Sequence, residues 1–199
     1  GTENTAVGTL AIGTGVTTGD QNTAVGYNAG AALTSGTLNT IIGAQAGDSL
    51  TSGDRNVAVG RSALSLEDEH GYNTAVGFAA LANLNAGADA LNTAVGYGAG
   101  NATTTAVQNT LIGAEVGDAL TTGSYNVAVG SGALSTEDTG RYNTAIGTFA
   151  LEVLNSDTTD AYNTAVGYKA GVAMTTGVNN TLLGGLAGDA ITTGFSNTA

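Results

Sequence analysis

The chain has 199 residues, of which 10% are charged, 32 are glycine and none is proline, cysteine or tryptophan. Acidic residues outnumber basic ones by 16 to 4, which gives a net charge of −12. The clustered lysines and arginines that bind nucleic acids or anionic membranes are therefore missing. The lack of cysteine excludes disulfides and thiolate metal sites, and no apolar run is long enough to insert into a membrane.

An Asn-Thr-Ala-Val-Gly motif, or a close variant, first occurs near the N-terminus and recurs along the whole chain. Most of its asparagines stand 17 residues apart, as Asn22 and Asn39 do. A sustained short period is typical of stacked proteins in which each repeat is one turn. The pattern predicts a single solenoid domain over residues 1–199, cut from a longer fibre. The twelve asparagines are Asn4, Asn22, Asn39, Asn56, Asn73, Asn92, Asn109, Asn126, Asn143, Asn163, Asn180 and Asn197.

Each repeat contains one segment typical of a β-strand and two turn signals. With the asparagine as position 1, Thr-Ala-Val at positions 2–4 favours a short strand, and the glycine at position 5 favours a turn. A second short strand is expected around positions 8–12, before a Thr/Ser-Thr/Ser-Gly turn. Helix is disfavoured because glycine recurs too often. The sequence thus predicts an all-β, parallel β-solenoid of about twelve 17-residue coils, roughly 55 Å long at about 4.8 Å per rung.

The asparagines and the apolar residues of this strand predict two kinds of stack. Stacked amides hydrogen-bond along a solenoid axis, so a structural ladder is expected. We expect position 4, which is always Val, Ile or Leu, to line the coil interior. Position 3 then faces the opposite side, and its bulky members predict burial against a neighbouring chain; they are Ile41, Leu111 and Leu182. The predicted ladder consists of Asn22, Asn39, Asn56, Asn73, Asn92, Asn109, Asn126, Asn143, Asn163 and Asn180.

A longer period groups the coils in fours, with blocks that start at Asn22, Asn92 and Asn163. First coils carry an exposed aromatic at position 6, and second coils carry a Gly-Asp pair. Third coils contain Glu-Asp, and fourth coils have extra residues near 85–90 and 155–160. The position-6 tyrosines are Tyr27, Tyr97 and Tyr168; they are candidates for sugar or receptor binding, or for lateral packing between chains.

The string Asn-Thr-Ala-Val-Gly-x-x-Ala-(Gly/Leu), followed by Thr-Thr-Gly, resembles two related groups of repeats. One is the head repeat of YadA-like trimeric autotransporter adhesins; the other is the Asn-Thr-Ala-x-Gly repeat of phage and algal-virus fibres and large bacterial surface proteins. The resemblance covers essentially the whole chain. It implies a left-handed β-roll, commonly a homotrimer, that presents adhesive surfaces outside the cell or on a virion.

Acidic residues in the turns are the candidates for metal binding. Calcium prefers carboxylate and carbonyl oxygens in glycine-rich turns, whereas aspartate after glycine also caps a turn without any metal. The only histidine, His70, lies in an acidic turn that we interpret as solvated, so no enzyme activity is expected. The candidate ligands for calcium are Asp48, Asp118, Asp189, Glu67, Asp68, Glu137 and Asp138. No other cofactor is expected.

Taken together, these patterns favour the shaft of an extracellular fibre or adhesin. Its expected partners are further copies of itself, in a trimer or a filament, and a cell-surface or matrix receptor. The alternative is a soluble module that binds ice through its many threonines or depends on calcium. Position 2 is threonine except at Val57 and Val127, so the threonine array needed for ice binding is interrupted.

Overall fold

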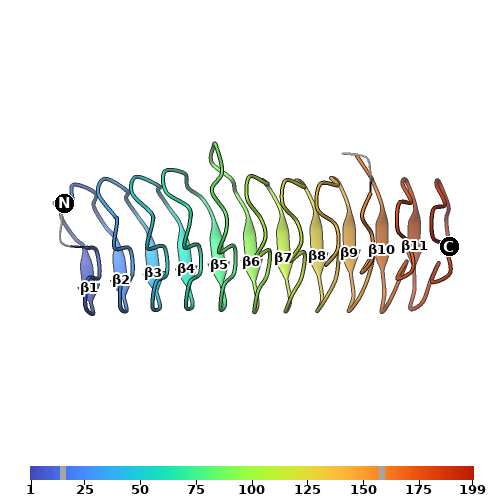
Figure 1. The fold of residues 1–199 in the computed structure, drawn as a ribbon, viewed down its shortest axis with the longest axis horizontal. Coiled ribbons are helices and arrows are strands. Elements are labelled where there is room, and N and C mark those ends of the chain that lie inside the picture. Colours follow the sequence, from blue (N-terminus) through green and yellow to red (C-terminus); the bar gives the residue numbers. More distant parts are fainter. Residues whose placement is uncertain (14–16, 157–159) are drawn as a thin grey trace.

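The computed structural model describes residues 1–13, 17–156 and 160–199 and confirms a parallel β-solenoid. Eleven strands of three residues form one sheet in sequence order, and no helix occurs among the described residues. The termini lie at opposite ends of the stack (Figure 1). The strands are β1 (Thr5–Val7), β2 (Thr23–Val25), β3 (Thr40–Ile42), β4 (Val57–Val59), β5 (Thr74–Val76), β6 (Thr93–Val95), β7 (Thr110–Ile112), β8 (Val127–Val129), β9 (Thr144–Ile146), β10 (Thr164–Val166) and β11 (Thr181–Leu183).

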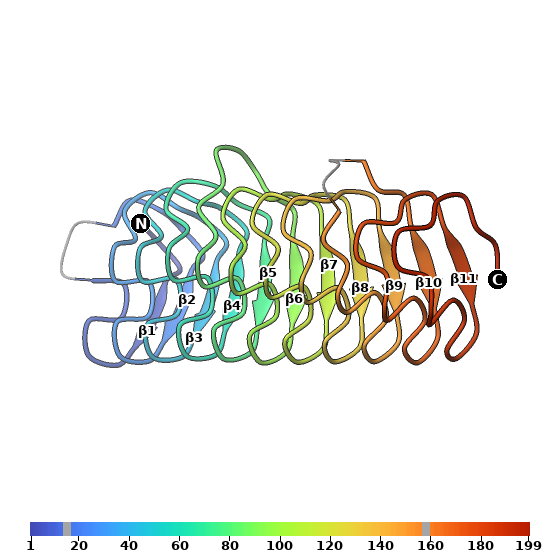
Figure 2. The same cartoon turned by 45° about the vertical axis from the view of Figure 1, so that its right-hand side comes forward.

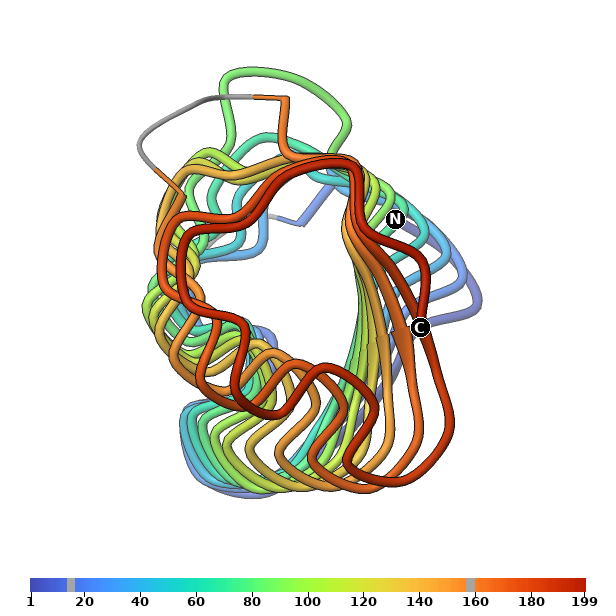
Figure 3. The same ribbon diagram turned by 90° about the vertical axis from the view of Figure 1, so that its right-hand side faces the viewer.

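The turns are stacked in strict register. Equivalent residues pair between neighbouring strands, so that Thr93 of β6 lies opposite Thr110 of β7. Figure 2 shows the strands following one another along one side of the stack, and the end-on view in Figure 3 shows successive turns superimposed. Register is retained because each coil is bonded to the next one at many points, as in the bond from the Gly47 amide to the Ala63 carbonyl (2.9 Å).

The second predicted strand of each coil is wrong. Positions 7–12 form consecutive turns, because positions 7 and 9 adopt the left-handed conformation that an extended strand cannot contain. In the coil that begins at Asn39, these residues are Gln45 (φ 59°) and Gly47 (φ 47°). The residue before each asparagine is also left-handed, as Leu38 (φ 61°) shows. Three such residues per coil bend the chain sharply enough to close a turn in 17 residues.

The predicted orientation of the strand is also wrong, because position 3 faces the interior and position 4 faces outwards. Ile41, Leu111 and Leu182 are completely buried in the core of the single chain and are not available to a neighbouring chain. The asparagine at position 1 is buried as well, and residues two apart in a strand lie on the same face. Positions 2 and 4 must then point outwards.

Core packing explains the four-coil period. Second coils carry the bulky position-3 residues, and the glycine at position 9 makes room for them. A Cβ atom added to Gly117 would lie 2.9 Å from Leu111 Cδ2, and one added to Gly100 would lie 2.7 Å from Leu111 Cδ1. Third and fourth coils have alanine at position 3 and leucine at position 9, and these leucines are fully buried. The members of that set are Leu64, Leu81, Leu134 and Leu151.

The asparagine column connects each coil to itself and to the next. The Nδ2 group of Asn109 donates to the Gly123 carbonyl across its own coil (2.9 Å), and its Oδ1 atom accepts from the backbone N–H of Asn126 (2.9 Å). Direct amide-to-amide bonds occur in addition, for example from Asn39 Nδ2 to Asn22 Oδ1 (3.0 Å). The ladder therefore consists mainly of bonds from side chain to backbone, and all ten predicted members are at most 1% exposed.

The extra residues of the fourth coil that begins at Asn73 form a loop outside the stack. Between β5 and β6 a loop projects beyond the neighbouring turns, where it is coloured green in Figures 1 and 3. The corresponding insertion predicted at 155–160 includes residues 157–159, which lie outside the described residues.

Candidate functional site

The outward face of the sheet carries two parallel columns of side chains. Position 2 contributes threonines in register, and position 4 contributes valine, isoleucine and leucine. The position-4 side chains are half-buried to exposed in the single chain; Ile112, for example, is 40% exposed. An apolar face of this kind is typical of an interaction surface. The prediction that the outward face of the strand is apolar was correct, but it assigned position 3 to that face instead of position 4.

A third outward column, which the sequence reasoning missed, consists of the residues before each asparagine. Three tyrosines stack in it: the ring centroids of Tyr125 and Tyr142 are 5.2 Å apart, and those of Tyr142 and Tyr162 are 4.9 Å apart. Further along the column, Arg55 lies over the ring of Tyr72 at 5.3 Å. The signal in the sequence was the recurrence of tyrosine directly before the asparagine.

The predicted position-6 tyrosines lie on the outer surface of the turns that follow the strands. Tyr27, Tyr97 and Tyr168 are each more than half exposed. Phe78, one coil before Tyr97, stacks on its ring at 5.4 Å with an interplanar angle of 12°. The coil after Tyr97 has the small Ala114 at position 6, so its other ring face meets no large side chain of that column.

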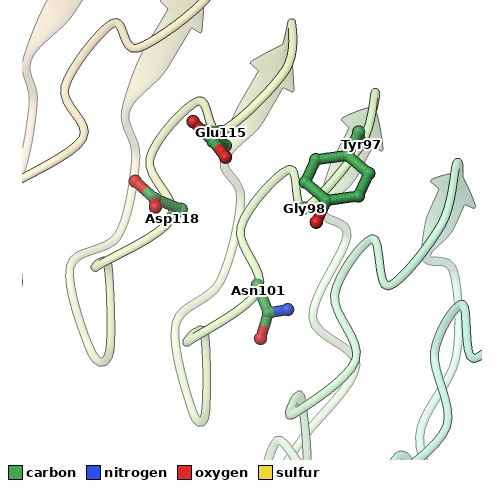
Figure 4. Close-up of a pocket in the computed structure, with 5 residues that line it drawn as sticks. All are labelled: Tyr97, Gly98, Asn101, Glu115 and Asp118. Atoms are coloured by element: carbon green, nitrogen blue, oxygen red, sulfur yellow. The ribbon is translucent and has the colours of Figure 1, made fainter.

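A surface pocket of about 330 Å³ lies at this uncovered side of Tyr97. Tyr97, Gly98, Asn101, Glu115 and Asp118 line it, and Figure 4 shows the tyrosine ring on one side and the two carboxylates on the other. Burial raises the pKa of Asp118, and the nearby charge of Glu115 raises that pKa further. The Asp118 Oδ1 atom is enclosed and has no hydrogen-bond partner among the described residues.

The structure does not bring the three Gly-Asp aspartates together. Asp48, Asp118 and Asp189 occur in second coils, four coils apart, so they cannot share one ion. Asp48 is half-buried, which raises the pKa of its carboxyl group, whereas Asp189 is exposed.

The third-coil glutamates contradict the interpretation of a solvated acidic turn. Glu67 and Glu137 are fully buried at position 12, which leucine, methionine or isoleucine occupies in most other coils. Their carboxylates accept bonds from the loop of the following long coil. The backbone N–H of Ala86 donates to Glu67 Oε2 (3.2 Å), and the hydroxyl of Ser156 donates to Glu137 Oε2 (2.8 Å). Each glutamate thus anchors the start of an inserted loop.

Glu67, Asp68 and His70 form a cluster that could hold a metal ion, since one ligand atom from each lies within 4.8 Å of the others. His70 Nδ1 is 3.5 Å from Glu67 Oε1. Three ligands including a histidine suit zinc better than calcium, which takes six to eight oxygens. Burial raises the pKa of Glu67, and the bonds from the amides of Ala86 and His70 oppose that shift. The equivalent coil has Glu137 and Asp138 but Gly140 in place of the histidine.

Comparison with known proteins gives no relative: no family model, curated protein or solved structure matches this chain. Among the described residues, no helix has the length and hydrophobicity needed to cross a membrane. A functional proposal must therefore depend on the geometry of the chain itself. The expectation that the protein is not an enzyme stays a prediction.

Proposed function

We propose that this protein is a shaft segment of an extracellular fibre, on a bacterial appendage or a virion, which gives rigid extension and displays surfaces for attachment. The observation that carries this proposal is the uninterrupted stack of in-register coils from β1 to β11. Hydrogen bonds between neighbouring coils run parallel to the long axis, through the strands, the turns and the asparagine column. A solenoid of this kind grows along one axis, because each repeat contacts only its neighbours, and this suits it to extension.

The outward sheet face supports lateral assembly of the shaft. Its aliphatic and threonine columns present an apolar strip along the whole stack, flanked by the tyrosine column. Burying the strip against two further copies would remove this apolar surface from water, which is the main driving force for association. We infer that the shaft is a homotrimer that assembles through this face, as the resemblance to trimeric adhesin repeats implies. Attachment to a receptor then depends on the turns, which stay outside the assembly.

Sedimentation velocity at micromolar protein concentration tests the assembly. We expect a trimer for the native chain and a monomer for Ile112→Glu, because that substitution places a charge in the centre of the apolar strip. Ser131→Glu is the matched control: it adds the same charge at an exposed position outside the strip and should leave the trimer intact. A native chain that sediments as a monomer would contradict this part of the proposal.

Ice binding is the second candidate, because the outward threonines of adjacent coils lie in register on one face. Val57 and Val127 interrupt the column in β4 and β8. The trimer would cover this face, so the two functions exclude each other. A thermal-hysteresis measurement distinguishes the two functions. Thermal hysteresis that is lost in Thr93→Tyr would support ice binding. A monomeric chain without thermal hysteresis would exclude ice binding.

A further inference from the structure

We propose that the pocket beside Tyr97 binds an organic ammonium group, such as the quaternary ammonium of choline or a primary amine. The biological meaning of this site rests on the proposed attachment function, to which it adds the chemical class of one ligand. The binding chemistry itself depends only on the pocket. Five residues from two adjacent coils supply it: an aromatic ring, two carboxylates, one amide and a glycine.

The aromatic part of the pocket is the end of a stacked column. Arg61 Cζ lies 5.9 Å from the Phe78 ring centroid, and Phe78 stacks on Tyr97 at 5.4 Å. The next position in this column is Ala114, whose methyl group leaves the second face of Tyr97 open. Stacking against Phe78 holds the Tyr97 ring in place although 57% of the residue is exposed. An open, fixed ring face attracts cations through its quadrupole.

The chain's own cations already use this type of contact. Of its four basic side chains, Arg55, Arg61 and Lys169 each lie over an aromatic ring. Lys169 is especially informative because it follows Tyr168, the counterpart of Tyr97 one block later, and its Nζ atom is 5.4 Å from that ring. Gly98 occupies the same position after Tyr97. Lys169 Nζ also lies 5.9 Å from the ring of Phe149 in the preceding coil. The third block therefore has an ammonium group of its own beside this tyrosine, and the second block has none at the matching position.

The polar part of the pocket has the charge that an ammonium group requires. Glu115 and Asp118 supply two carboxylates, whereas the third block has Leu186 and Asp189 at these positions. No basic side chain lines the pocket, and the enclosed Oδ1 atom of Asp118 has no partner among the described residues. A bound ammonium group would offset one of these two negative charges. An anionic sugar or a phosphate is excluded by the same two carboxylates.

The fifth lining residue favours a ligand that also has a hydroxyl group. The Asn101 amide oxygen accepts a bond from Asn83 Nδ2 (2.9 Å), so the amide nitrogen of this lining residue is the group that can still donate to a ligand. At about 330 Å³ the pocket is at the small end of the range for ligand sites, about 300–1,000 Å³. A choline-sized group fits this volume.

The test is a titration of the full chain followed by proton–nitrogen NMR, which resolves the Gly98, Asn101 and Glu115 amides separately. Choline and ethanolamine are the two cationic probes, and they distinguish a quaternary from a primary ammonium source. The neutral control is 3,3-dimethylbutan-1-ol, which has the shape of choline without its charge. We expect saturable shifts at these amides with one or both cations. Equal affinity for the neutral alcohol, or no response to either cation, would overturn the proposal.

Gly98→Lys is the most specific variant, since it copies the third block. Gly98 and Lys169 share the left-handed conformation (φ 63° and 56°). A Cβ atom at Gly98 meets nothing closer than Glu115 Cγ at 4.0 Å, so a lysine there is accommodated, and it should bring its ammonium group to the Tyr97 ring as Lys169 does at Tyr168. We expect it to abolish binding while circular dichroism and the melting temperature stay unchanged. Undiminished binding by this folded variant would refute the assignment.

Two further variants separate the ring from the charges. Tyr97→Leu should weaken choline binding about tenfold, because it removes the cation–π contact. Asp118→Asn should weaken it about threefold and reduce its dependence on salt. Tyr168→Leu, which alters the ring that already has its own lysine, should leave binding at Tyr97 unchanged. If the chain binds choline but sediments as a monomer, the trimeric shaft is refuted and the ammonium site is supported. If it sediments as a trimer but does not bind choline, the site is refuted and the shaft is supported.

Discussion

Replacing Asn109 by alanine tests whether the asparagine column is what keeps each coil closed. The side chain is buried, and it makes one bond across its own coil and one to the next coil, both 2.9 Å long. Alanine would leave the Gly123 carbonyl and the Asn126 amide without partners in a dry interior. Each unpaired buried group costs about 1–3 kcal/mol. We therefore expect the free energy of unfolding to fall by about 2–6 kcal/mol.

Urea unfolding followed by circular dichroism measures the loss, and hydrogen exchange of the Asn126 amide locates it. Thr110→Val is the matched control, because two coils of the chain already carry valine at that outward position; its effect should stay below about 0.5 kcal/mol. Asn109→Asp keeps the oxygen that accepts from the Asn126 amide, but its carboxyl group can donate to the Gly123 carbonyl only when it is protonated. The stability of this variant should therefore fall as the pH rises and the carboxyl group loses its proton. If Asn109→Ala were no more harmful than Thr110→Val, the asparagine bonds would not stabilise the coil.

Three other predictions concern packing, titration and the tyrosine column. Gly100→Ala should lower the free energy of unfolding by about 2–5 kcal/mol, because residue 100 has a left-handed backbone and its Cβ atom would lie 2.7 Å from the core residue Leu111. Gly98→Ala has nearly the same φ but open space around the Cβ atom, so it should cost clearly less in a thermal melt. Equal losses for the two variants would disprove the steric explanation. Burial raises the pKa of Glu67 above its ordinary value of 4.5, so the folded state binds the carboxyl proton more tightly than the unfolded state does. Stability should therefore fall as the pH rises from 4.5 through the raised pKa. Glu67→Gln should flatten the decline in melting temperature as the pH rises above 4.5, and an unchanged slope would argue against this explanation. Tyr142→Leu should remove more than one seventh of the near-ultraviolet circular dichroism, although Tyr142 is only one of seven tyrosines. The reason is that its ring stacks on Tyr125 at 5.2 Å and on Tyr162 at 4.9 Å. A loss of only one seventh would indicate independent rings.

The repeat period was enough to predict the fold, because 17-residue spacing with one β-favouring triplet per unit has few solutions other than a stacked parallel coil. The inside and outside of that triplet were assigned wrongly. The sequence contained the information needed: a buried asparagine at position 1 forces position 3 inwards and position 4 outwards. Apolar character was instead taken as the sign of burial, yet Ile112 is 40% exposed and the small Ala94 is completely buried.

The candidate sites were less predictable, because they depend on backbone conformations that propensity disfavours. Leucine, tyrosine and glutamate rarely adopt positive φ, but Leu38, Tyr142 and Glu115 do so here. That conformation turns the tyrosines before the asparagines into an outward column and places Glu115 beside Tyr97. The burial of Glu67 also escaped prediction, since one of the two amides that bond it belongs to the inserted loop one coil later. These features arise from contacts between coils, which one repeat read alone does not contain.

Because every strand pairs only with the one before it and the one after it, the chain has a simple mechanical consequence. Tension applied at the two ends reaches the bonds of one coil at a time, so coils should peel off singly and each should rupture at a similar force. A released coil of 17 residues extends to about 55–60 Å, whereas it occupied about 4.8 Å of the stack. Each rupture therefore lengthens the tether by about 50 Å and relaxes the load on the coils that remain. A stiff rod built in this way is also an extensible spring with a reserve of length about ten times its own.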